Sequence, residues 1–151
     1  AATGFVDQVI AALSDSSAED PTDPDIATNL GSAYVTKLRG ENVTSLERRE
    51  LTQEAMVQFD RALKLDGEHW EARFSKSMMQ VFAPAALGLQ VRAESNLGLL
   101  LEQQRTRPQQ PEHAHTYFFL SNLYANQGQG SKSQALRQEA SSLFPNDKRF
   151  R

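Results

Sequence analysis

The three histidines, His69, His113 and His115, are the side chains best suited to metal binding or acid–base chemistry. His113 and His115 are two positions apart, so on a helix their side chains point in different directions and do not share a metal ion. The sequence has no His-Glu-x-x-His motif and no other pair of histidines four positions apart. We therefore interpret all three as polar residues near helix starts, and we predict no metal site.

The remaining nucleophiles and glycine-rich segments lack the surroundings that their chemistry requires. No serine lies in a Gly-x-Ser-x-Gly elbow. The absence of cysteine excludes thiolate catalysis, disulfides and cysteine-bound zinc. Residues 128–130, Gly-Gln-Gly, lack the third glycine of a dinucleotide loop and the lysine of a phosphate loop, so they are interpreted as a turn. The sequence thus predicts a protein that is not an enzyme and holds no cofactor.

The composition describes a small and mildly acidic chain. Its 151 residues fit one domain or one short repeat array. The formal net charge is −3, which gives no electrostatic reason to expect nucleic acid or an anionic membrane as partner. No apolar run approaches the roughly 18 residues that a membrane span needs, so we predict no direct membrane insertion.

Two features bear on solubility and location. Arg105, Arg107 and the basic residues of 148–151 are interpreted as solubilising ends. The sequence begins with alanine, which indicates a processed product or an excised domain. We expect a soluble protein of the cytoplasm or the periplasm, and the sequence does not distinguish between these two compartments.

Apolar residues recur at helical spacing, and polar breaks divide the chain into four parts. A short N-terminal helix is predicted over 5–13, followed by a polar linker over 14–24. Pairs of helices are predicted within 23–67, 68–107 and 111–145, where the first two pairs carry inserts. Residues 1–151 are interpreted as a single domain.

Capping patterns predict where several helices begin and end. The predicted helix starts are Asp23 with Pro24, Thr44 with Glu47, and Ser131 with Gln134. Gly67 is predicted as a C-terminal cap, and Pro84 is predicted to stop or kink a helix. Residues 103–111 are polar and contain two prolines, so they are predicted as a loop.

Small residues mark the places where helices are expected to cross closely. Leu30, Gly31 and Tyr34 have the same spacing as Leu120, Ser121 and Tyr124, and Ser77 occupies the equivalent small position between them. The positions predicted to face the core of the partner helices are Leu51, Ala55, Phe59, Ala62 and Leu65, then Ala93, Leu97 and Leu100, then Ala135, Ala140, Leu143 and Phe144.

These residues resemble the tetratricopeptide repeat (TPR) family, whose helix–turn–helix unit has a period of about 34 residues. The resemblance covers roughly residues 23–145. The long-helix pattern is similar to that of divergent bacterial repeat proteins. It implies an all-α fold, a right-handed α-solenoid of about three TPR units plus an N-terminal helix. Departures are the inserts, Lys76 in place of a leucine, and Arg137 in place of an aromatic residue.

The resemblance also implies a concave peptide-binding groove lined by the first helix of each unit. Carried over by position, the groove residues are Asp25, Thr28, Ser32, Val35, Glu71, Phe74, Met78, Phe82, His115, Phe118, Asn122 and Asn126. Asn122 and Asn126 are one turn apart and suit hydrogen bonding to a peptide backbone. Phe74, Met78 and Phe118 suit an apolar floor, but they equally suit packing between helices, and the sequence leaves both interpretations open.

Two functions follow from this interpretation. The first is a non-catalytic protein–protein interaction module or scaffold that binds a partner peptide or helix in the groove. The alternative is a structural repeat protein that forms homo-oligomers through uncapped ends, because no polar helix follows Pro145 and an apolar terminal face is expected. A pocket for a free C-terminal carboxylate is not expected, because Thr28 and Ser32 stand where the family's carboxylate clamp needs lysine and asparagine.

Overall fold

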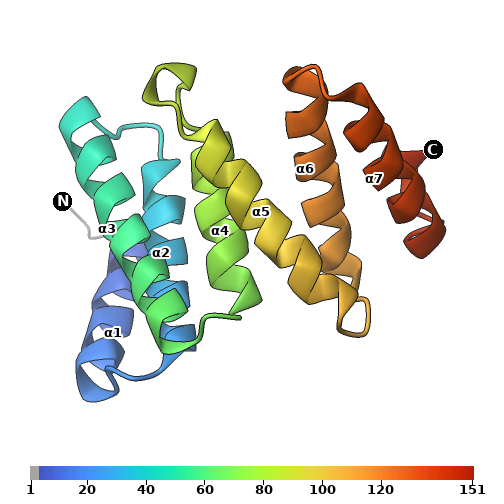
Figure 1. Cartoon of the computed structure of the whole chain (residues 1–151). Helices are drawn as coiled ribbons and strands as arrows, with labels where there is room; N and C mark the ends of the chain where they lie inside the picture. The colour runs from blue at the N-terminus through green and yellow to red at the C-terminus, as the bar shows by residue number, and fades with distance from the viewer. Residues whose placement is uncertain (1–3) are drawn as a thin grey trace. The chain divides into compact units, whose positions relative to one another are not determined.

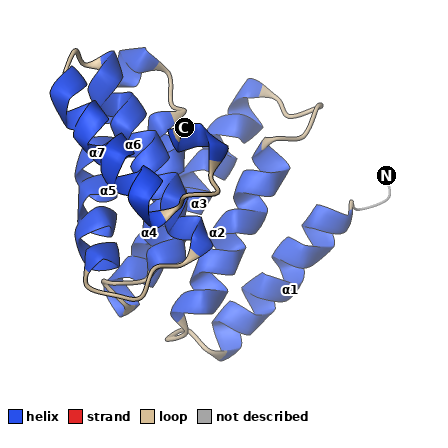
Figure 2. Ribbon diagram, turned by 90° about the vertical axis from the view of Figure 1, so that its right-hand side faces the viewer, coloured by secondary structure: helices blue, strands red, loops and turns tan. Residues whose placement is uncertain are grey.

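The computed structural model describes residues 4–151, and helices account for all of its regular structure (Figures 1 and 2). The α-helices are α1 (Phe5–Glu19), α2 (Pro24–Leu38), α3 (Ser45–Leu65), α4 (Trp70–Val81), α5 (Gln90–Arg105), α6 (Ala114–Asn126) and α7 (Gly130–Leu143). The 3-10 turns are η1 (Ala85–Leu87), η2 (Pro111–His113) and η3 (Lys148–Phe150). No strand occurs within 4–151. The chain forms two compact units, Ala1–Lys76 and Ser77–Arg151.

The first unit is organised around the crossing of α2 and α3, which pack along each other (Figure 1). Gly31 lies at this crossing, and a Cβ atom added there would come within 2.7 Å of the ring of Phe59. Phe59 is fully buried. The predicted small residue at the crossing is therefore confirmed at Gly31, because only glycine leaves room for this ring.

Helix α1 is longer than predicted. It runs to Glu19, so the linker predicted over 14–24 is wrong for most of its length. The hydroxyls of Ser14 and Ser16 donate to the carbonyls of Ile10 and Ala12, one turn back, which lets serines continue the helix. The polar composition of this segment therefore reflects an exposed helical face.

Arg61 on α3 holds the end of α1 in place. Its guanidinium donates to the hydroxyl of Ser17 at 2.5 Å and to the carbonyl of Pro21 at 2.6 Å. These contacts join residues 44 and 40 positions apart along the chain. Only residues 20–23 remain as the connection between α1 and α2.

The predicted starts of α2 and α3 are confirmed. Asp23 caps α2 by accepting from the backbone N–H groups of Asp25 and Ile26, with Pro24 at the first helical position. Thr44 and Glu47 form a reciprocal capping box at the start of α3. Both patterns are local, which is why the sequence alone identifies them.

Two other predicted caps are wrong. Helix α3 ends with Asp66 as its C-cap, and Gly67 does not adopt the left-handed conformation of a glycine cap. The carboxylate of Asp66 accepts from the N–H of Glu68 and closes the turn in its place. Helix α7 begins at Gly130, and its N-cap has no side-chain hydrogen bond, so Ser131 and Gln134 do not form a capping box.

The core of the second unit lies between α5, α6 and α7. Its buried apolar residues include Leu97, Leu100, Tyr117, Leu120, Leu123, Leu136 and Ala140. Ala135 is exposed and Leu143 is 41% exposed, so their predicted core positions are wrong. Leu136, the residue after Ala135, is buried in its place.

The turn after α7 repeats the geometry of two earlier turns. The C-cap residues are Asp20 (φ −125°, ψ 86°), Asp66 (φ −135°, ψ 100°) and Phe144 (φ −126°, ψ 64°). In each turn the next helix or 3-10 turn begins four residues after this C-cap. The turn before η3 thus resembles the turns that precede α2 and α4.

The expectation of an apolar face beyond α7 is not met. Phe150 in η3 is buried, and Arg137 donates to the carbonyl of Arg149 at 3.0 Å, which fixes the segment against α7. The exposed side of α7 consists mainly of polar residues: Ser131, Lys132, Gln134, Gln138 and Ser142. Copies of the protein would stack end to end in order to bury an exposed apolar face. The described residues form no such face at this end of the chain.

We expect Gly31→Leu to lower the free energy of unfolding by at least about 2 kcal/mol, because its side chain would overlap the buried ring of Phe59. The matched control is Gly98→Ala in α5, where an added Cβ meets nothing within 4 Å. This control should stabilise the protein by about 0.5–1 kcal/mol through helix propensity. Urea unfolding followed by circular dichroism measures both. Wild-type stability of Gly31→Leu would show that the crossing is not tight.

Candidate functional site

In the first unit, His69 connects two of the predicted groove residues. Its Nε2 is 2.8 Å from a carboxylate oxygen of Asp25, and its Nδ1 is 3.6 Å from a carboxylate oxygen of Glu71. The backbone N–H of Ala72 donates to Nδ1 at 3.3 Å, so Nδ1 is an acceptor and Nε2 carries the proton given to Asp25. Buried His69 therefore donates to the exposed carboxylate of Asp25, whereas the exposed carboxylate of Glu71 lies near Nδ1 without a hydrogen bond from it.

The other predicted residues of the first unit differ in exposure. Thr28 is buried and donates its hydroxyl to the carbonyl of Pro24 at 2.8 Å, so it is a packing residue and not part of a surface. Ser32 and Val35 are half-buried on α2. Phe74 is half-buried and stacks on Trp70, with ring centroids 4.8 Å apart.

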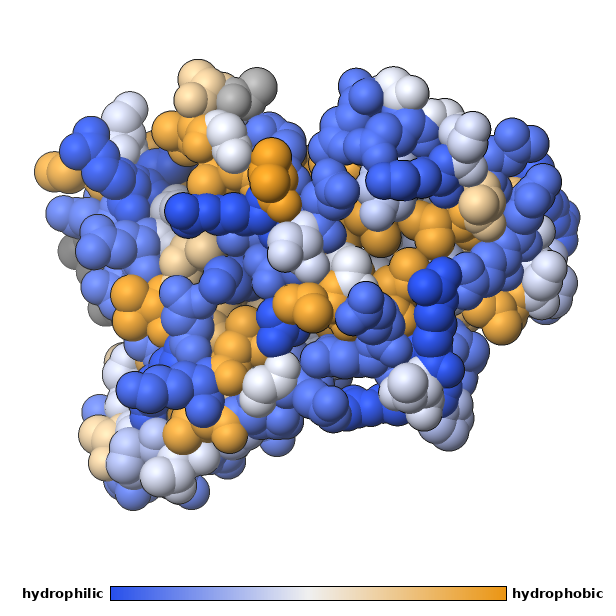
Figure 3. All heavy atoms as spheres, viewed as in Figure 1, coloured by the Kyte–Doolittle hydropathy of each residue, from blue (hydrophilic) through white to orange (hydrophobic). Residues whose placement is uncertain are grey.

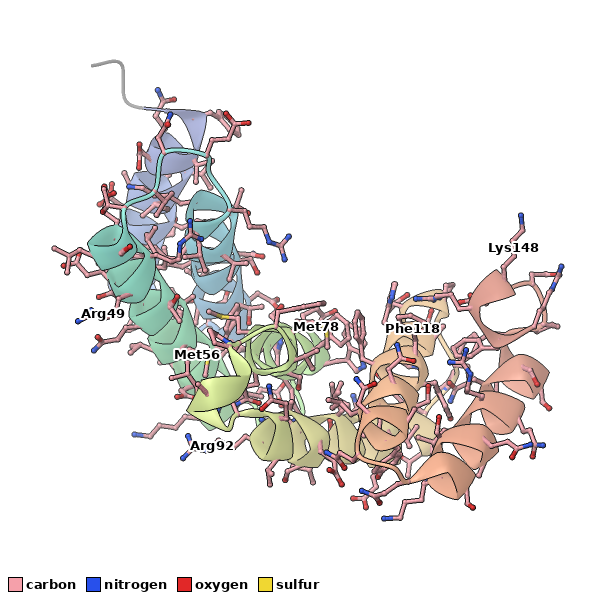
Figure 4. All side chains as sticks on the ribbon, turned by 90° about the horizontal axis from the view of Figure 1, so that it is seen from above. Arg49, Met56, Met78, Arg92, Phe118 and Lys148 are labelled. Atoms are coloured by element: carbon pink, nitrogen blue, oxygen red, sulfur yellow. The ribbon has the colours of Figure 1, made fainter. Side chains whose placement is uncertain are left out.

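In the second unit, the structure brings predicted residues together into a surface that we call the α6 surface. We define it as partly exposed residues of α6 and the two residues of the preceding segment predicted with them: Met78, Phe82, His115, Phe118, Phe119, Asn122 and Asn126. Ring contacts join Phe82 to α6. Figure 4 shows the labelled Met78 and Phe118 on the same side of this unit, with Arg92 on the other. Phe82 directly follows the last residue of α4 and is 69% exposed.

Three aromatic rings form the apolar part of the α6 surface. The ring of Phe119 makes edge contacts with Phe82, at 5.8 Å between centroids, and with Phe118, at 5.2 Å. Phe118 and Phe119 are both half-buried. Sequence reasoning missed Phe119, because its neighbour Phe118 alone matches the carried-over position. Phe118 therefore both packs on Phe119 and keeps exposed area, and its place in a groove stays a prediction.

Two asparagines flank the rings. Asn122 is half-buried and Asn126 is exposed, one turn later on the same side of α6. Within residues 4–151 neither side-chain amide has a hydrogen-bond partner. Each amide offers one acceptor and two donor hydrogens, which is the complement of a peptide backbone.

His115 and Phe118 are in contact with Arg149 from the segment after α7. The Nη1 of Arg149 is 2.9 Å from Nδ1 of His115, and the guanidinium lies 5.2 Å from the ring centroid of Phe118. Burial and the positive charge of Arg149 lower the pKa of His115 below its ordinary value. The carboxylate of Asp147 binds the same guanidinium, which lowers the pKa of Asp147 to about 2.

A network behind the α6 surface fixes α6 between its neighbours. Arg105 of α5 binds both carboxylate oxygens of Glu139 of α7, at 2.9 and 2.6 Å, and the hydroxyl of Tyr117 donates to Glu139 at 2.8 Å. Arg105 thus pairs with Glu139 and joins α5 to α7, so its interpretation as a solubilising residue is wrong. Burial and the contact with Glu139 raise the pKa of Tyr117 to about 12.

Apolar side chains are also exposed around the connection between α4 and α5. Leu87 is 62% and Val91 is 72% exposed, close in sequence to Phe82. Figure 3 shows apolar side chains gathered around this connection among hydrophilic ones. Gly88 has φ +61° here, a conformation that other residues rarely adopt.

Comparisons with known proteins place the fold. No model of a known protein family and no curated protein matches the chain. The structure is similar to the crystal structure of a thermophilic TPR protein in Thermus thermophilus, with a TM-score of 0.72 and 18% sequence identity. The match covers 97% of this chain and 70% of that chain. The chain is a TPR-like helical repeat protein.

This result confirms the predicted all-α repeat fold. In the TPR-like chain, α2 packs with α3 and α6 packs with α7, which are the pairs expected for the first and third units. The exact division into three units and an N-terminal helix remains a prediction. So does the role of the groove residues, because a likeness at this level of identity establishes only the fold.

Other classes of site find no support in the described residues. Within 4–151, no group of three or more histidine, aspartate or glutamate side chains is arranged to hold a metal ion. None of the helices there is both long and apolar enough to cross a membrane. His69 and His113 accept from backbone N–H groups at helix starts, as the sequence predicts.

We expect Glu139→Gln to lower the free energy of unfolding by about 1 kcal/mol at pH 7, because it removes the charge that Arg105 binds. Arg105 lowers the pKa of Glu139, so the stabilisation is complete above the ordinary pKa of glutamate and is lost as the pH falls through the lower pKa of the folded state.

Urea unfolding of wild type and variant at pH 7 and pH 3 measures this effect. The difference between them should be smaller at pH 3. Glu102→Gln, which removes a charge from the exposed side of α5, is the matched control. A difference that is the same at both pH values would contradict the role of the charged pair.

Proposed function

We propose that this TPR-like protein is a non-catalytic interaction module whose α6 surface binds a segment of a partner protein. The observation that carries the proposal is the combination of a partly exposed aromatic cluster with two side-chain amides that have no partner among the described residues. Phe82, Phe118 and Phe119 form the cluster, and Asn122 and Asn126 carry the amides.

The chemistry of this surface suits a peptide segment. Aromatic rings bury a large apolar area at low entropic cost, which favours one or two apolar side chains of the partner. The two amides are spaced by one helical turn, so they can bind consecutive backbone groups of an extended segment or the polar edge of a helix. Met78 adds an adaptable apolar contact.

The first unit offers a surface of different chemistry. Asp25 and Glu71 carry exposed carboxylates close to His69, and the rings of Trp70 and Phe74 stack on each other in the same unit. Carboxylates and aromatic faces together favour a positively charged side chain. We include Asp25, Ser32, Val35, Glu71 and Phe74 in the proposed binding residues of the protein, and we leave out the buried Thr28.

The fold supports the proposal as an analogy. TPR-like folds commonly present the first helices of their units to other proteins, and helix α6 occupies that place in the third predicted unit. The surface of α6 is therefore the expected location for a partner, and its residues are partly exposed.

We expect the double substitution Phe118→Ala and Asn122→Ala to abolish capture of partner proteins from lysate of the source organism. Both changes remove contact groups of the α6 surface. Helicity should stay close to that of the wild type, whereas the lost packing of Phe118 on Phe119 lowers the melting temperature. The tagged chain serves as bait in affinity capture, and the captured partners are identified by mass spectrometry.

The control is the double substitution Gln134→Ala and Gln138→Ala on the exposed side of α7. It should capture the same partners as the wild type. Capture that persists after the substitutions on α6, or that is lost equally after those on α7, would refute the assignment to the α6 surface.

A further inference from the structure

Part of the α6 surface is covered by the chain itself. Residues 145–151 return to α6, where Arg149 contacts His115 and Phe118. The backbone of this segment is fixed by Arg137, which donates to the carbonyl of Arg149, and by the buried ring of Phe150. A partner segment that contacts His115 and Phe118 must therefore displace Arg149.

The groups around Arg149 match the chemistry of a guanidinium. Its planar group is near two aromatic rings, at 5.2 Å from the centroid of Phe118 and 5.8 Å from that of Phe150. Its Nε donates to the carboxylate of Asp147 at 2.9 Å, and Nη1 faces Nδ1 of His115 at 2.9 Å. A lysine ammonium lacks both the flat face and the fork of donors, so these contacts select arginine.

The contact with His115 also fixes a protonation state. A guanidinium only donates hydrogen bonds, so Nδ1 of His115 must accept, and the ring is neutral with its proton on Nε2. The charged groups around His115 are Arg149 and Asp147 from the segment after α7 and Glu112 from η2. Because a neutral ring favours the contact, a fall in pH that protonates His115 weakens it.

We infer that His115 and Phe118 form a guanidinium-binding subsite of the α6 surface, which Arg149 fills within the chain and an arginine of the partner fills in its place. The inference rests on the proposed function, because it names the side chain that the partner presents there. Arg149 is 31% exposed, so an incoming segment can reach it without unfolding the unit.

The test uses the full chain with Arg149→Ala and a synthetic heptapeptide of sequence Pro-Asn-Asp-Lys-Arg-Phe-Arg, which copies residues 145–151. NMR titration should show saturable binding to the variant, with shifts at His115 and Phe118. Binding to the wild type should be about tenfold weaker, which corresponds to a subsite that is filled for about nine tenths of the time.

Controls separate the subsite from a general charge effect. Arg92→Ala removes an exposed arginine from α5 and should bind the peptide as weakly as the wild type. A peptide with lysine in place of both of its arginines, at the fifth and seventh positions, should not bind. Arg149→Lys keeps the positive charge and serves as a second variant if Arg149→Ala unfolds. Peptide binding to the open variant should weaken as the pH falls through the pKa of His115.

Equal binding of the peptide to wild type and Arg149→Ala, or equal binding of the lysine peptide, would overturn the inference and leave residues 145–151 as a structural cap. Failure of the proposed function has a different signature. In that case the peptide still binds the open variant, but no partner capture depends on Phe118 and Asn122. Capture that depends on Asn122 but not on any arginine of the partner would reject the subsite alone.

Discussion

The close crossing of α2 and α3 at Gly31 is the constraint on which the first unit depends. A pair of amphipathic helices leaves apolar area exposed unless its backbones approach closely and further helices pack beside it. In the first unit, the missing side chain of Gly31 gives room to the buried ring of Phe59. In the second, the fully buried Ser121 lies on α6 near the equally buried Tyr117. Packing buries one side of α2 and of α6, and the other side of each helix stays partly exposed.

Local signals made a large part of the fold predictable. Capping by Asp23 and the Thr44–Glu47 box depend on residues within three positions of each other, so the sequence contains everything they need. Apolar periodicity located α3 and α5 for the same reason. The linker predicted over 14–24 was wrong because polar residues there form an exposed helical face, whose end also contacts Arg61, a residue distant in sequence. Composition alone does not distinguish an exposed helical face from a loop.

The α6 surface shows the same division between local and distant information. The family resemblance assigned His115, Phe118, Asn122 and Asn126 to the first helix of the last unit, and all four lie on α6. The contribution of Phe119 depends on Phe82, 37 positions earlier, and the role of Arg149 depends on its return to His115. Neither contact has a sequence signature, because tertiary packing brings the two partners together. The network of Arg105, Tyr117 and Glu139 was missed for the same reason.

The central claim is that the α6 surface, and not the exposed side of α7, meets the partner. The most direct measurement places the photoreactive residue p-benzoylphenylalanine at position 122 of α6 or at position 138 of α7, and compares cross-linking in lysate of the source organism. The account predicts a discrete adduct from position 122 and none from position 138. Adducts of equal yield from both positions, or an adduct from position 138 alone, would contradict it.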